Sequence, residues 1–362
     1  MKLLKLGIKN YRNCENVLMN FPTRKTLIIG KNAQGKTNIL ESIYFLSDLK
    51  SPRTSTISDL IQFNKSQFEI NAEVYKNDTN IELDYLYTSE KKREFKINKV
   101  KTNAKNFKLV VKTVLFSTKD MLLLRGTPED RRNWLDRAIS QIYPAYDERL
   151  SKYDKIRIQK NNLLKQEIID EKLYDIYNEQ LVITGANIIY LRKKYLKEIE
   201  KIAADKHHTI SDSEEFSLNY TCPKDEIGDI SEYLKLELNE RRKEEFARHQ
   251  SVVGPHRDDI EFKINGVDAA KFASQGQQRT LVLSLKLSEL EIIRQKTGFY
   301  PILLLDDVLA ELDDKRQNYL LKSIDTNTQT IITSVDTLLF EQDFLKDVTI
   351  YNIENGNIKN RE

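Results

Sequence analysis

The chain has 362 residues, with 58 lysines and arginines against 55 aspartates and glutamates, and a formal net charge of +3. Hydrophobic residues make up 40% of it, and no stretch approaches the roughly 18 apolar residues that a membrane-spanning helix needs. This composition excludes an integral membrane protein, and so small a net charge indicates nucleic-acid binding only if the positive residues cluster.

The first third of the chain is expected to be rich in strands. Apolar and polar residues alternate at Leu3–Ile8, Thr26–Ile29, Phe68–Val74, Ile81–Tyr87 and Leu109–Leu115. One helix is expected after residue 35. The N-terminal segment lacks the apolar run and the small-residue cleavage site of a signal peptide, so a mature, cytoplasmic protein is expected. The two cysteines, Cys14 and Cys222, form no CxxC pair, so neither a disulfide framework nor a zinc site is predicted.

A glycine-containing loop follows the predicted strand that ends at Ile29. It matches the phosphate-binding pattern G-x-x-x-x-G-K-[ST] with Gly30, Lys31, Asn32, Ala33, Gln34, Gly35, Lys36 and Thr37. Glycines let such a loop wrap a polyphosphate, and backbone N–H groups at the following helix N-terminus face the anion. The motif predicts that Lys36 reaches the β/γ-phosphates of ATP and that Thr37 is a ligand of Mg²⁺. A chance match is the alternative, and the helical run Asn38–Leu46 after the loop argues against it.

Positive residues gather between residues 91 and 112, where Glu94 is the only acid. They are Lys91, Lys92, Arg93, Lys96, Lys99, Lys101, Lys105, Lys108 and Lys112. Such a cluster would give salt-sensitive, sequence-independent DNA binding, and the candidates for DNA contact are Lys91, Lys92, Arg93, Lys99 and Lys101. An edge hairpin protected by lysines against aggregation explains the same pattern equally well. A second basic stretch at Arg192–Lys194 is a weaker signal.

The middle of the chain is expected to be helical. From about Pro128 to Ala247, glycines are few and apolar residues recur at three- and four-residue spacing. Strand-like alternation returns at residues 259–267 with a turn at Asn265–Gly266, as if the strand-rich lobe resumed after an insertion. We therefore expect an ATP-binding lobe over residues 1–125, a helical lobe over residues 126–250, and a final segment over residues 251–362 that completes the ATP-binding lobe.

Two further motifs lie in that final segment. Ile302–Leu305 is an apolar strand that ends in Asp306 and Asp307, as expected where a buried parallel strand delivers carboxylates to the edge of a sheet. Asp306 is predicted to hold Mg²⁺, and Asp307 to orient or polarise the attacking water. Before this strand, Ser274-Gln275-Gly276-Gln277-Gln278-Arg279 leads into a helix over Leu281–Ile293. Serine and glycine at a helix start expose N–H donors to an anion, although an ordinary capped helix has the same appearance.

The P-loop, the Ser274–Arg279 segment, the acidic strand and Glu311-Leu312-Asp313 occur in the order found in ABC/SMC-type ATPases, which the chain resembles. The resemblance is closest to the RecF family, in Asn10-Tyr11-Arg12-Asn13, Lys31–Asn38, Gly254-Pro255-His256-Arg257-Asp258-Asp259, Gln275–Thr280 and Leu304–Asp307. It implies an α/β fold, an ABC/SMC-type ATPase head with mixed sheets around a P-loop and an inserted helical lobe. It also implies that Arg12, Asn13 and Asn38 contact the nucleotide.

The resemblance carries a mechanism as well. Ser274, Gln275 and Gly276 would bind the γ-phosphate of a nucleotide held by a second subunit, so that ATP closes a homodimer and hydrolysis reopens it. The closed form would hold duplex DNA near a junction with single-stranded DNA and, with RecR and RecO, assist RecA loading at gaps. These are the activities of DNA repair, replication, recombination and the SOS response.

Three departures from the superfamily pattern predict slow turnover. Asp307 stands where SMC proteins and transporters have Glu, Ser117 stands at the position of the Q-loop glutamine, and Thr333-Ser334-Val335-Asp336 lacks the switch histidine. These features favour a weak, DNA-stimulated ATPase that serves as a switch. A transporter ATPase subunit and a structural clamp with little turnover remain alternatives. For His256 a role in shaping a turn is preferred to a catalytic role. Trp134 is interpreted as a core residue.

Overall fold

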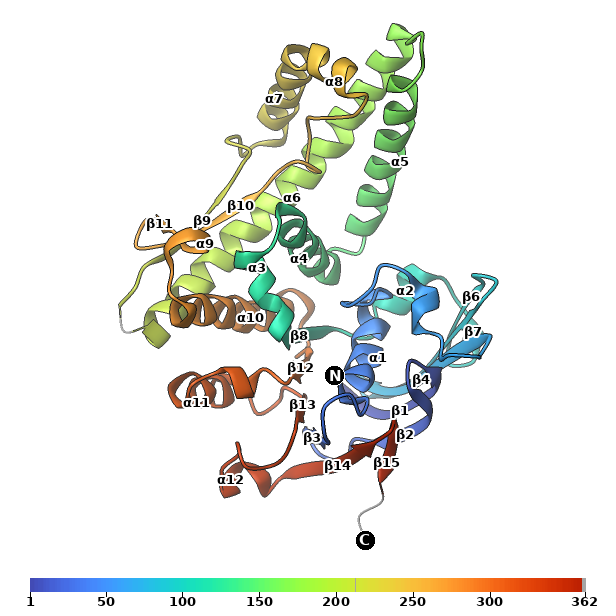
Figure 1. Ribbon diagram of the computed structural model, residues 1–362, viewed down its shortest axis with the longest axis vertical. Helices are drawn as coiled ribbons and strands as arrows, with labels where there is room; N and C mark the ends of the chain where they lie inside the picture. The colour runs from blue at the N-terminus through green and yellow to red at the C-terminus, as the bar shows by residue number, and fades with distance from the viewer. Residues whose placement is uncertain (212, 360–362) are drawn as a thin grey trace. The chain divides into compact units, whose positions relative to one another are not determined.

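The computed structural model describes residues 1–211 and 213–359. The chain divides into two compact units, each drawn in Figure 1. The sheet unit consists of Met1–Asp120 and Lys286–Glu362, and the helical unit of Met121–Leu285. Within the described residues no helix is both long enough and apolar enough to cross a membrane.

The sheet unit contains a mostly parallel sheet, and the nucleotide motifs of this unit lie where its strands end. Its strand order is β15-β14-β3-β13-β12-β8. The strands are β3 (Lys25–Ile29), β8 (Thr113–Ser117), β12 (Ile302–Asp306), β13 (Thr330–Ser334), β14 (Val348–Glu354) and β15 (Asn357–Lys359). All are parallel except β15, so the carboxyl ends of β3, β8, β12 and β13 meet at one edge. The apolar residues of β12 are buried, as expected for a strand that is covered on both faces.

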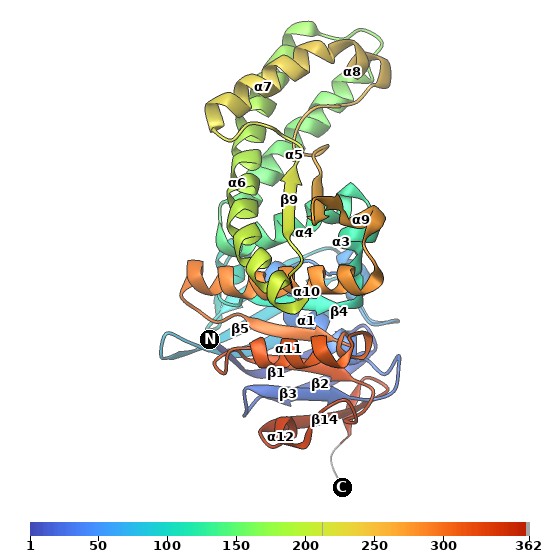
Figure 2. The same cartoon turned by 90° about the vertical axis from the view of Figure 1, so that its left-hand side faces the viewer.

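A second, antiparallel sheet of the sheet unit has the order β2-β1-β4-β5-β6-β7. Its strands are β1 (Lys2–Tyr11), β2 (Cys14–Asn20), β4 (Gln67–Lys76), β5 (Thr79–Thr88), β6 (Arg93–Ile97) and β7 (Val100–Lys101). Helix α1 (Lys36–Asp48) contacts strands of both sheets, and Figure 2 shows it among them. Phe45 of α1 packs edge-on against Phe68 and Tyr85 of the second sheet, so α1 joins the two sheets into one core.

Short helices complete the sheet unit. They are η1 (Ile57–Leu60), α2 (Ala104–Lys108), η3 (Leu309–Glu311), α11 (Asp314–Ser323) and α12 (Gln342–Leu345), while η2 (Thr118–Met121) crosses the boundary between the units. The expectation of one helix in the first part of the chain missed α2. The expected strand Leu109–Leu115 begins only at Thr113, because α2 extends to Lys108 and Leu109 forms its cap.

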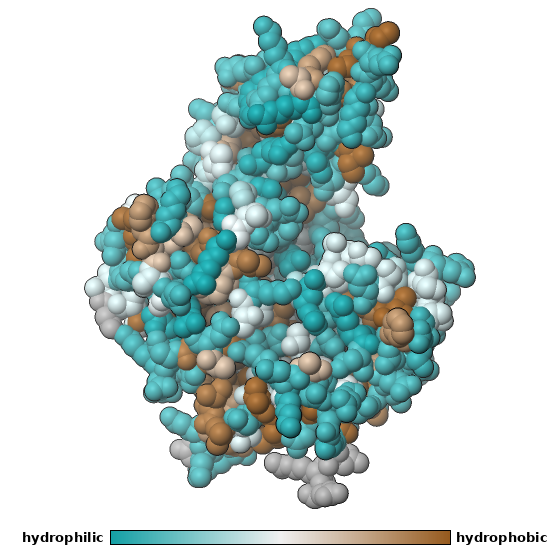
Figure 3. All heavy atoms as spheres, viewed as in Figure 1, coloured by the Kyte–Doolittle hydropathy of each residue, from teal (hydrophilic) through white to brown (hydrophobic). Residues whose placement is uncertain are grey.

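The helical unit is built on the long helix α6. Its helices are α3 (Leu122–Arg125), α4 (Pro128–Ile142), α5 (Tyr146–Leu164), α6 (Glu171–Ser211), α7 (Ile227–Glu240), α8 (Arg242–Arg248) and α9 (Ala269–Phe272). Helix α10 (Gln275–Thr297) begins here and crosses into the sheet unit. Helix α4 starts with a capping box between Thr127 and Asp130 and with Pro128 in its first turn, a strong start signal. Hydrophilic residues cover most of this unit on the face drawn in Figure 3.

A small antiparallel sheet in the helical unit corrects one expectation. Strand β9 (Phe216–Tyr220) lies within the segment expected to be wholly helical, and it pairs with β10 (Ile260–Ile264), which pairs with β11 (Val267–Asp268). The strand-like residues 259–267 therefore do not resume the sheet of the ATP-binding lobe. Their hydrogen bonds to β9 hold them in the helical unit, so the second boundary lies at Leu285 where residue 250 was expected. The predicted Asn265–Gly266 turn is confirmed, with φ values of 50° and 78°.

Candidate nucleotide site

The loop between β3 and α1 lies at the edge where the parallel strands end. Both glycines of the loop are required by their surroundings. A Cβ on Gly30 (φ 159°) would lie 2.4 Å from the carbonyl oxygen of Ile353, and a Cβ on Gly35 (φ 109°) would lie 2.8 Å from Asn13 Oδ1. Ala33 also has a positive φ, 65°. The loop is therefore wound tightly against the end of β14 and against the turn between β1 and β2, as a phosphate-binding loop requires.

Lys36 begins helix α1 with its side chain folded over this loop. Its ammonium group donates to the carbonyl oxygens of Gly30, at 2.7 Å, and Lys31, at 3.3 Å. The side chain is 4% exposed and lies 4.0 Å from the Asp307 carboxylate. A buried ammonium held by two neutral carbonyl groups and a distant carboxylate is suited to pair with a bound anion.

Thr37 and Asp306 are brought together from distant parts of the chain. The Thr37 hydroxyl donates to Asp306 Oδ1 at 2.9 Å, and the Thr333 hydroxyl donates to the same oxygen at 3.0 Å. Burial raises the pKa of Asp306, while the two hydroxyl hydrogen bonds act in the opposite direction. The predicted Mg²⁺ ligands thus lie within reach of one cation position, at the carboxyl ends of β3 and β12.

The donor set fits Mg²⁺ and no metal that needs an all-protein cage. Among the described residues, no group of three or more His, Cys, Asp and Glu side chains could hold a metal ion. Two oxygen ligands from the protein leave the remaining octahedral positions to phosphate oxygens and water, which is the usual arrangement for Mg²⁺ in nucleotide sites.

Asp307 has a left-handed backbone with φ 52°, which aspartate tolerates better than most residues. Its backbone N–H donates to the Thr333 hydroxyl at 2.9 Å, so Thr333 holds both carboxylate-bearing residues in place. Asp307 is 37% exposed. An exposed carboxylate beside Lys36 is in a position to contact a water molecule that approaches a bound phosphate.

Hydrogen bonds hold Arg12 and Asn13 beside the loop. One of their partners, Glu41, was not predicted from the sequence. Glu41 of α1, 1% exposed, accepts hydrogen bonds from Arg12 Nε at 3.1 Å and Nη2 at 2.9 Å. Burial opposes the charge on Arg12, but the hydrogen bonds and charge of Glu41 outweigh it and raise the pKa of Arg12. Asn13 Oδ1 accepts from Asn38 Nδ2 at 2.7 Å. A lone glutamate in the apolar run of α1 was the available signal for this network.

The residues at the positions of the missing Q-loop and switch groups have clear partners. Ser117 is in register with Asp306 on the neighbouring strand, but its backbone N–H and hydroxyl both donate to Asp120. Thr333, at the position of the switch segment, donates to Asp306. At the position of the superfamily's switch histidine, this chain therefore has a threonine that contacts the predicted Mg²⁺ ligand.

The Ser274–Arg279 segment belongs to the helical unit, where it begins α10. The Ser274 hydroxyl accepts from the backbone N–H of Gln277 at 3.3 Å, and Gln277 Oε1 accepts from the backbone N–H of Ser274 at 2.8 Å. This reciprocal pair is a capping box. Gln277 Nε2 donates to Glu214 Oε1 at 2.7 Å, which fixes the start of α10. Ser274 and Gln275 are exposed. In the sheet unit, Asp313 of the Glu311–Asp313 motif caps α11 by accepting from the backbone N–H of Arg316.

The basic segment forms the edge of the antiparallel sheet at β6 and β7. The side chains of Lys92, Lys99 and Lys101 are 78%, 83% and 79% exposed and pair with Glu90, Glu82 and Glu94 respectively. Lys91 lies in the turn before β6 and Arg93 at its start, both exposed. Lys112 is buried and Lys108 pairs with the buried Asp48, so these two do not extend the exposed cluster. The fold brings in Glu82 and Glu90, which the sequence pattern did not include.

Three other residues singled out in the sequence have mainly packing roles. Trp134 is buried and packs edge-on against Phe262, as expected of a core residue. Arg192 of the weaker basic stretch is buried and pairs with Asp136, so it is not part of an exposed cluster. Cys14 is buried, and burial raises the pKa of its thiol to about 12.

Comparison with known proteins agrees with this geometry. The model of the RecF/RecN/SMC N-terminal domain family matches residues 2–359. The chain is 40% identical to the DNA replication and repair protein RecF of Streptococcus gordonii, over 99% of this chain and all of that protein. It is 36% identical to the protein of that name from Bacillus subtilis, over 98% of this chain and 99% of that protein.

Solved structures give the same result. The recombination mediator protein RecF, solved with ATP in work on the RecFOR pathway, superposes with a TM-score of 0.91 and 34% identity, over 99% of this chain and 97% of that one. An SMC head bound to the C-terminal winged-helix domain of ScpA has 15% identity and a TM-score of 0.57, which supports the fold alone. The chain has the fold of an ABC/SMC-type ATPase head and belongs to the RecF family.

Proposed function

We propose that this protein is an ATP-controlled DNA-binding switch that acts in DNA repair and replication. The observation that carries the proposal is the cluster of Lys36, Thr37, Asp306 and Asp307 at one edge of the parallel sheet. It provides a cation for phosphate oxygens, two ligands for Mg²⁺ and a carboxylate for water. RecF relatives are named as DNA replication and repair proteins, and one was solved with ATP.

In this proposal the loop from Gly30 to Thr37 binds the phosphates of ATP through backbone N–H groups, and Lys36 pairs with the β/γ-phosphates. Thr37 and Asp306 would hold Mg²⁺, which would supply positive charge beside the phosphate oxygens. Arg12, Asn13 and Asn38 line the same loop and add polar contacts. Asp307 orients the attacking water, and its short side chain is consistent with slow hydrolysis.

A second copy of the chain completes the binding site for the γ-phosphate. Ser274 and Gln275 are exposed and Gly276 is partly exposed at the start of a helix of more than six turns, where backbone N–H groups and the helix dipole favour an anion. Binding of these groups to the nucleotide of a partner subunit would close a homodimer in the presence of ATP. Hydrolysis would remove the bridging phosphate and reopen it, so occupancy of the site would control access to DNA.

DNA is proposed to bind as duplex near a junction with single-stranded DNA, with RecR and RecO as partners in RecA loading. The exposed residues Lys91, Lys92, Arg93, Lys99 and Lys101 are proposed to contact its phosphates. Their ion pairs with glutamates lie at the surface, where such pairs contribute little and exchange readily for phosphate.

Changing Asp307 to Asn is expected to preserve ATP binding while slowing hydrolysis by about a hundredfold or more, because the variant cannot accept a proton from or polarise the attacking water. The Asp307 side chain makes no hydrogen bond that holds the fold together, so the variant should remain folded. Single-turnover hydrolysis of radiolabelled ATP measures the effect. Asp314→Asn, at an exposed carboxylate of α11, is the matched control. Hydrolysis by Asp307→Asn at the wild-type rate would assign water activation to another group.

Changing Lys91, Lys92, Lys99 and Lys101 together to Glu is expected to weaken duplex binding and flatten its salt dependence. Each phosphate contact removed lowers the slope of log affinity against log salt by about 0.9. Fluorescence anisotropy over a series of salt concentrations measures the slope. Lys9, Lys50, Lys65 and Lys322, exposed lysines elsewhere in the sheet unit, form the charge-matched control when changed to Glu. An unaltered slope would leave the lysines as protection of a sheet edge.

A structural clamp with little turnover is the second candidate, favoured by the short Asp307 side chain and the absence of a switch histidine from the sequence Thr333–Asp336. Single-turnover hydrolysis with and without DNA separates the two functions. Stimulation by DNA supports a switch, and the same negligible rate in both conditions supports a clamp.

A further inference from the structure

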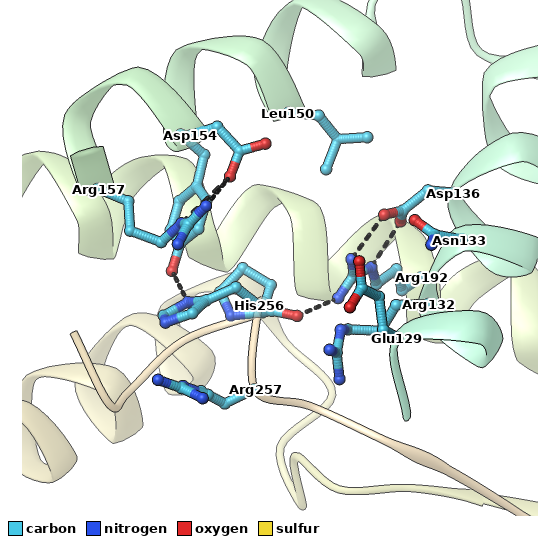
Figure 4. A pocket seen from close by; sticks show the side chains of 12 residues that line it. Glu129, Arg132, Asn133, Asp136, Leu150, Asp154, Arg157, Arg192, His256 and Arg257 are labelled. Atoms are coloured by element: carbon cyan, nitrogen blue, oxygen red, sulfur yellow. Dashed lines mark hydrogen bonds and ion pairs between the residues drawn. The ribbon is translucent and has the colours of Figure 1, made fainter. Parts of the chain in front are cut away.

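A polar pocket of about 320 Å³ lies within the helical unit, and none of the nucleotide motifs contributes a residue to its lining. Figure 4 shows side chains from four segments that surround it: Arg132 of α4, Arg157 of α5, Arg192 of α6, and His256 and Arg257 of the loop before β10. This loop carries the Gly254–Asp259 motif, to which the nucleotide site gives no role. The pocket therefore offers an explanation for residues that the proposed ATP switch leaves unused.

The backbone of the motif is fixed from several sides. Arg192 Nη1 donates to the carbonyl oxygen of Pro255 at 2.6 Å. His256 Nε2 lies 3.1 Å from the carbonyl oxygen of Ser251, which only accepts, so Nε2 carries the proton and Nδ1 accepts from the Tyr153 hydroxyl at 2.7 Å. A Cβ on Gly254 (φ 122°) would lie 2.2 Å from that hydroxyl oxygen. The histidine is thus a support of the loop, and the loop presents Arg257 in a fixed place.

Charge within the pocket is not balanced by the protein. Four arginines line it against three carboxylates, those of Glu129, Asp136 and Asp154, an excess of one positive charge because His256 is neutral. Asp136 accepts two hydrogen bonds from the buried Arg192, which donates to neither of the other two carboxylates. The remaining arginines therefore face only two exposed carboxylates.

Three of the arginines retain N–H groups for a ligand. Arg257 donates only to the carbonyl oxygen of Ser251, which also accepts from His256 and so has more donors around it than lone pairs. Arg132 donates to the carbonyl oxygen of Asp258 at 2.7 Å and pairs with no carboxylate. Arg157 pairs with Asp154 of its own helix at 3.1 Å, across an exposed contact that an incoming anion can replace.

Titration of two pocket residues agrees with a positive potential. Burial lowers the pKa of His256 to about 3, and the charges of three arginines, Arg157, Arg257 and Arg132, act in the same direction. Burial and the charge of Arg192 also lower the pKa of the Arg132 guanidinium, against the opposing charges of Asp259, Glu129 and Asp258. An anion bound between these residues would offset the positive charges that lower both pKa values.

We propose that this pocket binds a phosphodiester group of the DNA backbone, held by Arg132, Arg157 and Arg257. A phosphodiester carries one negative charge, which equals the excess in the pocket, and guanidinium groups bind phosphate oxygens through pairs of parallel hydrogen bonds. The inference rests on the proposed DNA-binding function, and it adds a contact in the helical unit to the contacts proposed for the basic edge of the sheet unit.

The lining favours phosphate over an acidic segment of a partner protein. Leu150 and Pro255 are the apolar residues of the lining, and its two rings, Tyr153 and His256, are hydrogen-bonded to each other. Protein partners are usually anchored by apolar or aromatic side chains buried in a pocket, whereas backbone phosphates are held mainly by arginine, lysine and polar groups.

The test measures binding of a fluorescein-labelled duplex to the full chain in the presence of ATP. The double variant Arg157→Gln, Arg257→Gln is expected to bind about tenfold more weakly at low salt, with a salt slope lower by about 0.9. Asp154→Asn, which removes a carboxylate that competes with phosphate, is expected to bind more tightly than wild type. An increase in affinity cannot result from misfolding, so the pair of variants separates the pocket from a loss of structure.

Arg149→Gln, Lys152→Gln, at two exposed residues of α5 outside the pocket lining, is the charge-matched control and should bind like wild type. Unchanged duplex affinity in the double variant and in Asp154→Asn, with a wild-type protein that binds duplex, would overturn this inference alone. Loss of binding to a poly-glutamate peptide without loss of duplex binding would assign the pocket to a protein partner. Failure of the wild type to bind duplex under any nucleotide condition would overturn the proposed function itself.

Discussion

Changing Lys36 to Ala is expected to lower ATP affinity by roughly a hundredfold, since each hydrogen bond between an ammonium and a phosphate contributes about 1.5–3 kcal/mol. The ammonium is almost completely buried, donates to two loop carbonyl oxygens and has only a distant carboxylate nearby. Alanine removes the buried charge and leaves a helix former at the start of α1, so the fold should be retained. Equilibrium binding of a fluorescent ATP analogue measures the loss.

The control for this variant is Lys50→Ala, at an exposed lysine just after α1, which should bind ATP as wild type does. Thermal unfolding of both variants without nucleotide checks that the loop has not collapsed. Wild-type ATP affinity in a folded Lys36→Ala variant would show that the loop between β3 and α1 is not the phosphate site.

Changing Ser274 to Arg is expected to weaken ATP-dependent dimerisation strongly while leaving ATP binding by the monomer intact. The larger side chain would block the exposed N–H groups at the start of α10 from a partner's γ-phosphate, and the loss of two charge-assisted hydrogen bonds weakens association by roughly a hundredfold. The capping hydrogen bond to Gln277 is lost as well, at a cost of about 1 kcal/mol, which the unit should withstand. Ser274→Thr keeps a capping hydroxyl and should dimerise.

Mixing gives a sharper form of this test. A heterodimer of Ser274→Arg and Lys36→Ala chains has one site with both changes and one site with neither, so part of the ATP-dependent association or hydrolysis should return on mixing. Light scattering and ATPase measurements on the mixture detect it. If Ser274→Arg cannot bind ATP as a monomer and mixing restores nothing, the segment serves its own chain and the shared-site mechanism is wrong.

The sequence predicted the strands and helices around the phosphate loop because their signals are local. The strand before Gly30, the helix after it and the apolar strand ending in Asp306 are all present, and the fold class is confirmed. The alternation in Phe216–Tyr220 was overlooked because it is short and lies between helical segments. Without its partner, residues 259–267 were assigned to the wrong sheet.

The contacts that complete the sites join residues far apart in sequence, and no local pattern predicts them. Glu41 holds Arg12, and Thr333 holds Asp306, only because strands and helix from distant segments meet at one edge. The sequence pattern of the basic segment did not include Glu82, which pairs with Lys99 from the neighbouring strand β5. The arginine pocket was also hidden, since its members come from three helices and a loop.

In the proposed mechanism, ATP closes a homodimer and the closed form binds DNA. This mechanism is tested most directly by measuring molar mass and duplex affinity together, on the same sample, with ATP, with ADP and without nucleotide. We predict dimers and tight DNA binding with ATP, and monomers with weak binding in the other two states, with the Asp307→Asn variant holding the ATP state longest. The same mass and the same affinity in all three states would contradict this mechanism.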